Sequence, residues 1–133
     1  MTAQEVVIDQ ALARLATDSY YEFVKQAFAV LEPETQYLDN FHVQYLCNTV
    51  QSMVERAGRR ESKKRNLIIN IPPRAMKSVI TTICIVPWAW IHFPHLKFIA
   101  SSYSAALSLE HSSKARRIIE SPWYKRHWGD RYQ

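Results

Sequence analysis

The residues best suited to chemistry lie at positions 71–78, in the stretch Ile-Pro-Pro-Arg-Ala-Met-Lys-Ser. A phosphate-binding loop needs convergent backbone N–H groups, a lysine for the terminal phosphates and a hydroxyl for Mg²⁺ where a helix begins. Lys77 and Ser78 stand at the last two of these positions. Ile71 and Met76 replace the usual glycines, and a bulky residue at Met76 is costly if that position needs a positive φ. An ordinary proline-rich turn with an exposed lysine is the alternative.

The residues on either side predict a strand before this loop and a helix after it. Residues 67–71 form a short apolar run rich in β-branched side chains, which indicates a buried strand. Residues 77–86 predict a buried helix that stops or kinks at Pro87. The uncharged run at 79–93 is fifteen residues long. A span of the bilayer needs about 20, so a transmembrane helix is not expected.

A second strand and helix follow. Residues 96–100 are apolar, and Ser104 is a candidate N-cap for a helix over 105–119. The order strand, loop, helix, strand, helix points to right-handed crossovers and a parallel sheet covered by helices. The expected fold class is therefore α/β, with an incomplete sheet of the P-loop NTPase type and an α-helical segment before it.

Helices are predicted upstream of the loop. Apolar spacings of three and four predict two amphipathic helices between positions 3 and 31, with Asp18 or Ser19 as a cap between them. A third helix is predicted over 41–56, ending near Gly58. These patterns divide the chain into a helical N-terminal segment, 1–40, and a second part, 41–133, which contains the loop and the expected sheet.

Charge divides the 133-residue chain in a similar place. The first fifty residues carry seven acids and two bases, whereas residues 51–133 carry fifteen bases and five acids. A basic body suggests a polyanionic partner, although a solvated surface has the same composition. The stretch 55–65 holds six of these bases and is either a solvated loop or a nucleic-acid contact. Cys47 and Cys84 lack metal-binding spacing and indicate buried thiols of a reducing compartment.

Several stretches, taken in order, resemble one family. Residues 66–78, with Ile-Asn-Ile-Pro-Pro-Arg before Met-Lys-Ser, resemble the ATPase centre of the phage terminase large subunit, the motor that packages DNA into procapsids. Further similar stretches are Phe41-His42, Pro-Trp-Ala-Trp at 87–90, Ala-Ser-Ser-Tyr-Ser at 100–104, and Ser-Pro-Trp-Tyr at 121–124 followed by Trp-Gly-Asp-Arg at 128–131. The resemblance covers about residues 39–133.

The resemblance implies a set of roles for individual residues. Lys77 would contact the β- and γ-phosphates of ATP, Ser78 would ligate Mg²⁺, and Arg74 would sense or stabilise the γ-phosphate as a catalytic residue. Phe41 would stack on adenine and Gln44 would read its edge. The residues implied to bind nucleotide are Pro73, Arg74, Ala75, Met76, Lys77, Ser78, Phe41 and Gln44.

The same resemblance implies partners and a location. The partners would be double-stranded DNA, a terminase small subunit and a portal protein, and the complete motor would be a homo-oligomer. The compartment would be the cytoplasm of the bacterial host, with no membrane association.

The acidic residues that ATP hydrolysis requires are not recognisable. After Ser78 the only acids are Glu110, Glu120 and Asp130, and none of them ends an apolar strand. The family's metal-dependent nuclease cluster is not recognisable either. We therefore expect an N-terminal piece truncated before the Walker B strand, which binds nucleotide weakly and does not turn it over alone. There are two alternatives. One is a non-enzymatic basic module that binds nucleic acid through 56–65 and 114–117. The other is an unstable remnant of a decayed prophage gene.

Overall fold

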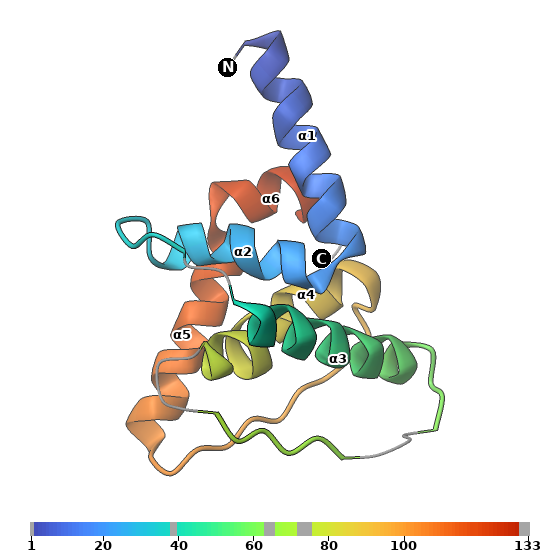
Figure 1. Cartoon of the computed structure of the whole chain (residues 1–133), viewed down its shortest axis with the longest axis vertical. Coiled ribbons are helices and arrows are strands. Elements are labelled where there is room, and N and C mark those ends of the chain that lie inside the picture. The colour runs from blue at the N-terminus through green and yellow to red at the C-terminus, as the bar shows by residue number, and fades with distance from the viewer. Residues whose placement is uncertain (1, 38–39, 63–65, 72–75, 131–133) are drawn as a thin grey trace.

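The computed structural model describes residues 2–37, 40–62, 66–71 and 76–130, and these residues form helices joined by extended or irregular segments (Figure 1). The helical elements, in chain order, are α1 (Ala3–Asp18), α2 (Tyr20–Leu31), α3 (Phe41–Gly58), the π-helical turn η1 (Val79–Ile83), α4 (Ile85–His92), α5 (Ala105–Glu120) and α6 (Pro122–Trp128).

The helix ends follow the local sequence closely. Ser19 caps α2, and Ser104 caps α5 by accepting a hydrogen bond from the Leu107 backbone N–H at 3.2 Å. The predicted helices at 3–31, 41–56 and 105–119 are thus confirmed, to within a few residues at their ends. Gly58 lies inside the last turn of α3 and has no positive φ. Its role is close approach, since a Cβ there would lie 2.4 Å from the Phe93 ring.

The predicted parallel sheet is wrong for the described residues, which contain no β-strand. Residues 67–71 and 96–100 are extended, but neither makes ladder hydrogen bonds with a described residue. Their side chains do alternate as in a strand. Leu67, Ile69, Leu96 and Phe98 line a hollow against α3 and α4, whereas Ile68 and Ile99 are 83% and 101% exposed.

The correction has a clear physical reason. A β-branched run shows that a segment suits a pleated, half-buried surface, but a strand also needs a neighbour that supplies backbone hydrogen bonds. Both extended segments have the helical layer on one face and no paired strand at their edges among the described residues.

The predicted stop or kink at Pro87 is also wrong. The helical path breaks earlier, at Cys84, and α4 then runs from Ile85 through Pro87 to His92. Proline is tolerated here because it lies in the first turn of α4, where backbone N–H groups lack intrahelical partners in any case.

The core lies where α2 crosses α3, α4 and α6. Tyr20, Phe23 and Val24 of α2 are fully buried, and Trp88 of α4 and Tyr124 of α6 pack with them. Buried polar atoms of the aromatic side chains are used as donors: Trp88 Nε1 donates to the Ala16 carbonyl at 3.0 Å, and the Tyr124 hydroxyl donates to the Pro87 carbonyl at 2.7 Å. These bonds tie α1 and α6 to α4.

Candidate phosphate-binding turn

The backbone at Met76 is left-handed directly before a helix begins. Its φ is +63°, in the left-handed region that L-residues rarely adopt. Lys77 and Ser78 follow in helical conformation, and the Met76 carbonyl accepts the first helical hydrogen bond, from Ile80 N–H at 3.0 Å. A left-handed residue next to right-handed ones turns successive N–H groups toward one concavity, which suits an anion.

The two side chains with predicted phosphate and metal roles lie at this helix start. Lys77 is exposed, and Ser78 is half-buried. The Lys77 carbonyl accepts a hydrogen bond from the Thr81 hydroxyl at 2.7 Å, which reinforces the first turn. The prediction that Lys77 and Ser78 open a helix agrees with these bonds, whereas their roles toward phosphate and Mg²⁺ stay predictions.

The residues that follow the turn are packed into the core. Ile80 and Ile83 of η1 are buried, and the buried Tyr20 hydroxyl donates a hydrogen bond to the Ile80 carbonyl. Burial raises the pKa of Tyr20 well above its usual value, so the hydroxyl keeps its proton and remains a donor. A π-helical turn frequently marks a functional position, and η1 follows Ser78 directly.

Some predicted site residues fall outside the described part of the chain. Pro73, Arg74 and Ala75 belong to the 72–75 stretch, so the structure places neither the loop apex nor the predicted catalytic arginine.

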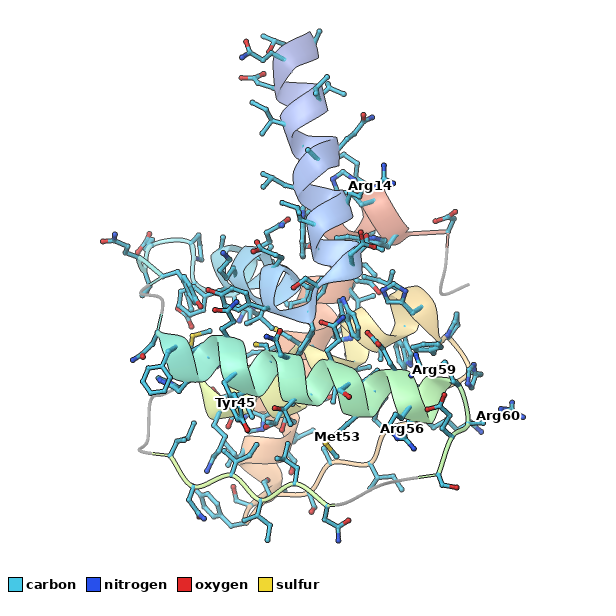
Figure 2. The ribbon with its side chains drawn as sticks, turned by 45° about the vertical axis from the view of Figure 1, so that its right-hand side comes forward. Arg14, Tyr45, Met53, Arg56, Arg59 and Arg60 are labelled. Carbon is cyan, nitrogen blue, oxygen red and sulfur yellow. The ribbon has the colours of Figure 1, made fainter. Side chains whose placement is uncertain are left out.

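The residues predicted to contact adenine are described. Phe41 is the first residue of α3, and both Phe41 and Gln44 are exposed. α3 packs against η1, and Figures 1 and 2 place the N-terminal end of α3 near the start of η1. Tyr45, four residues after Phe41, is also largely exposed and projects to the side of α3 where the extended segments lie (Figure 2). Sequence reasoning missed Tyr45, although aromatic residues four apart lie on one helix face and could have indicated it.

The predicted basic stretch is largely neutralised where it is described. Figure 2 shows Arg56, Arg59 and Arg60 at the C-terminal end of α3. Glu61 lies 3.2 Å from Arg56 Nη1 and 3.0 Å from Arg59 Nε, and Glu55 lies 3.7 Å from Arg59 Nη1. Guanidinium groups held in this way are less available to phosphates than the composition suggests. Residues 63–65 lie outside the described part.

The described residues contain neither a metal-binding cluster nor a membrane-spanning helix. No group of three or more His, Cys, Asp or Glu side chains could hold a metal ion there. No helix in the same part is long and apolar enough to cross a membrane. Comparison with protein-family models, curated proteins and solved structures found no match.

Proposed function

We propose that the turn at Met76 binds the phosphates of ATP, as the nucleotide-binding segment of a DNA-packaging motor of the phage terminase type. The observation that carries the proposal is the positive φ of Met76 immediately before a helix that opens with Lys77 and Ser78. Nothing in the residue type favours that conformation, which costs an L-residue roughly 1–2 kcal/mol. A strained backbone at such a position supports a functional turn.

The chemistry follows from the geometry of the turn. Backbone N–H groups at the helix start and the helix dipole favour an anion there. The exposed Lys77 ammonium would neutralise the β- and γ-phosphates, and the Ser78 hydroxyl would ligate Mg²⁺. Phe41 and Tyr45 would offer aromatic surface to the base. Arg74 keeps its proposed role at the γ-phosphate through the resemblance alone.

The assignment to DNA packaging rests on the ordered resemblance of 66–78 and the neighbouring stretches to terminase large subunits. Double-stranded DNA, a small subunit and a portal protein are the partners that this assignment proposes. Of the three acids after Ser78, Glu110 lies in α5 with its carboxylate 3.0 Å from Lys114 Nζ. The proposal is therefore of nucleotide binding, and it assigns none of these acids to the orientation of an attacking water.

Calorimetric titration with Mg²⁺-ATP tests the proposal. Wild-type protein should bind, and Lys77→Ala should weaken binding by at least about tenfold, since one charge-assisted contact contributes on this scale. Lys97→Ala is the matched control, because Lys97 is an exposed lysine on the 96–100 segment. Absence of ATP binding by the wild-type protein, or equal loss in both variants, would overturn the proposal.

A further inference from the structure

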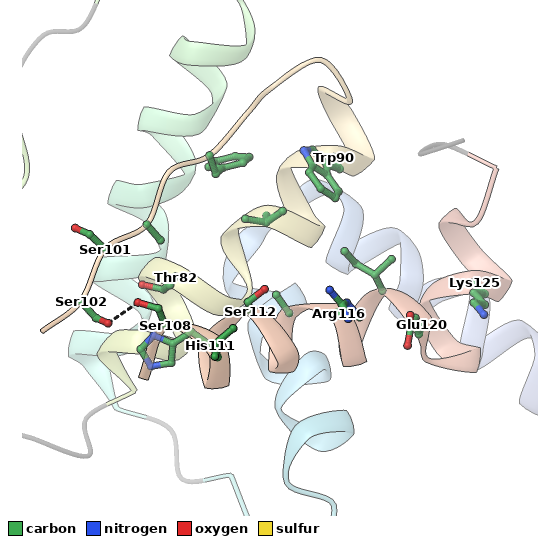
Figure 3. Close-up of a pocket in the computed structure, with 16 residues that line it drawn as sticks. Thr82, Trp90, Ser101, Ser102, Ser108, His111, Ser112, Arg116, Glu120 and Lys125 are labelled. Atoms are coloured by element: carbon green, nitrogen blue, oxygen red, sulfur yellow. Dashed lines mark hydrogen bonds between the residues drawn. The ribbon is translucent and has the colours of Figure 1, made fainter. Parts of the chain in front are cut away.

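A hollow of about 800 Å³ lies between α4, the segment from Phe98 to Ser102, and α5 (Figure 3). Ligand sites in proteins measure roughly 300–1,000 Å³, so the hollow has the size of a small-molecule site. One face of α5 lines it, because four of the lining residues recur along this helix at spacings of three and four: Leu109, Ser112, Arg116 and Ile119.

Apolar side chains from three elements line the hollow. Val86 and Trp90 of α4 face it, together with Phe98 of the extended segment and Ile119 of α5. The Trp90 indole N–H already donates a hydrogen bond to the Leu96 carbonyl at 2.9 Å, so its ring offers apolar surface and needs no partner from an occupant. This lining favours a ligand with a hydrocarbon body.

The charged side chains of the lining leave one positive charge without a counter-charge. Arg116 of α5 and Lys125 of α6 line the hollow, and neither makes an ion pair with a described residue. Glu120 is the one acid among the described lining residues. Figure 3 shows Arg116 on α5 between Ser108 at one end of the hollow and Lys125 at the other. With His111 counted as neutral, a ligand that carries one negative charge would neutralise the lining.

The hydroxyl groups at the other end of the hollow are engaged within the chain. The Ser102 hydroxyl donates to the Ser104 carbonyl at 2.8 Å, and the Ser102 and Ser108 hydroxyl oxygens lie 2.6 Å apart. Since Ser102 donates its proton to Ser104, Ser108 is the donor in the second bond. Neither proton is free for a ligand, so the charged head group of a ligand belongs at Arg116 and not at this end.

We propose that the hollow binds a single-chain aliphatic carboxylate, with the carboxylate at Arg116 and Lys125 and the hydrocarbon chain along the apolar lining toward Leu109. A guanidinium group can form two parallel hydrogen bonds with a carboxylate, which makes Arg116 the main contact of the head group. The distance along α5 from Arg116 to Leu109 is about 10 Å at 1.5 Å per residue, which accommodates a chain of medium length. Lys77 and Ser78 do not line the hollow, so this inference is independent of the phosphate proposal.

Titration of the full chain with dodecanoate, below its critical micelle concentration, tests the inference, and heteronuclear NMR follows the tryptophan indole N–H signals. The Trp90 signal should shift and saturate because Trp90 lines the hollow, whereas the signal of the buried Trp88 should not move. Dodecyltrimethylammonium has the same chain and a positive head group, and should bind about tenfold more weakly or worse. Acetate has the same head group without the chain, and should leave the Trp90 signal in place.

Substitutions in α5 test the two halves of the site. Arg116→Gln should weaken dodecanoate binding by about three- to tenfold, because it removes a charge-assisted contact that is partly exposed to solvent. Arg117→Gln is the matched control, since Arg117 is also exposed on α5 but does not line the hollow. Leu109→Asp should also weaken binding, because it places a negative charge where the hydrocarbon chain would lie.

Far-UV circular dichroism checks that each variant is folded. Three results would each overturn the inference: no saturable shift of the Trp90 signal with dodecanoate, equal binding of dodecanoate and dodecyltrimethylammonium, or equal loss of binding in Arg116→Gln and Arg117→Gln. ATP titration of Arg116→Gln should match wild type, because the hollow and the Met76 turn use different residues.

Discussion

Because the backbone at Met76 is left-handed, we expect glycine to be more stable than alanine at this position, which is the reverse of the usual order. At most positions alanine is more stable than glycine, because glycine loses about 0.5–1 kcal/mol more conformational entropy on folding. A residue with a Cβ held at φ +63° incurs a penalty of roughly 1–2 kcal/mol that glycine escapes. The two terms oppose each other, and the second is larger. Met76→Gly should therefore be about 0.5–1 kcal/mol more stable than Met76→Ala.

Comparing the two variants with each other isolates the backbone term. Both remove the half-buried Met76 side chain that packs on the core, so its loss cancels in the difference. Ser113, exposed within α5, is a matched control where alanine should exceed glycine by about 1 kcal/mol. Arg60, with φ +58°, is a second site where glycine should exceed alanine.

The assay is urea unfolding followed by tryptophan fluorescence, since Trp88 and Trp128 are buried in the folded state. The two variants of a pair should show the same dependence of unfolding free energy on urea concentration. A difference between their unfolding midpoints then reports a difference in stability alone. If Met76→Ala proved as stable as Met76→Gly, or more so, the left-handed turn before Lys77 would be refuted, together with the strain that supports the phosphate proposal.

Two further predictions concern the contacts that hold α1 and α6. The Arg126 guanidinium beside Asp9 holds the pKa of that carboxyl below its usual value, so the ion pair stabilises the fold above about pH 4 and is lost as the pH falls through the lowered pKa. Asp9→Asn should cost up to about 1 kcal/mol at pH 7 and nothing in strong acid, as urea unfolding at both pH values checks. Tyr124→Phe should cost roughly 1–2 kcal/mol, because the Pro87 carbonyl loses a buried donor, whereas exposed Tyr45→Phe should leave the unfolding midpoint unchanged.

The helices could be read from the sequence because their signals are local. Apolar spacing and capping residues act within a few positions of the chain, and Ser19 and Ser104 cap the helices as expected. The break at Cys84 could not be read in this way. Proline usually ends or kinks a helix, so the local sequence predicts a stop or kink at Pro87, but the helical path breaks before it, at Cys84. The break places Pro87 in a first turn, where proline is tolerated.

The candidate site was predictable in its residue types and less so in its geometry. The sequence predicts Lys77 and Ser78 at the start of a helix, and it indicates that Met76 is costly if its φ is positive. Only the fold shows that the backbone adopts this φ. How α3 packs decides that Tyr45 is exposed beside Phe41. How the last turn of α3 ends decides that Arg56 and Arg59 pair with acids.

The sequence by itself determined the helices, their caps, the division of charge along the chain and the placing of Lys77 and Ser78 next to each other, because each depends on neighbouring residues. The tertiary structure decided whether the apolar runs at 67–71 and 96–100 become strands. Sheet formation needs hydrogen-bonding partners from distant parts of the chain, and the described residues supply a helical layer on one face of those runs and no paired edge.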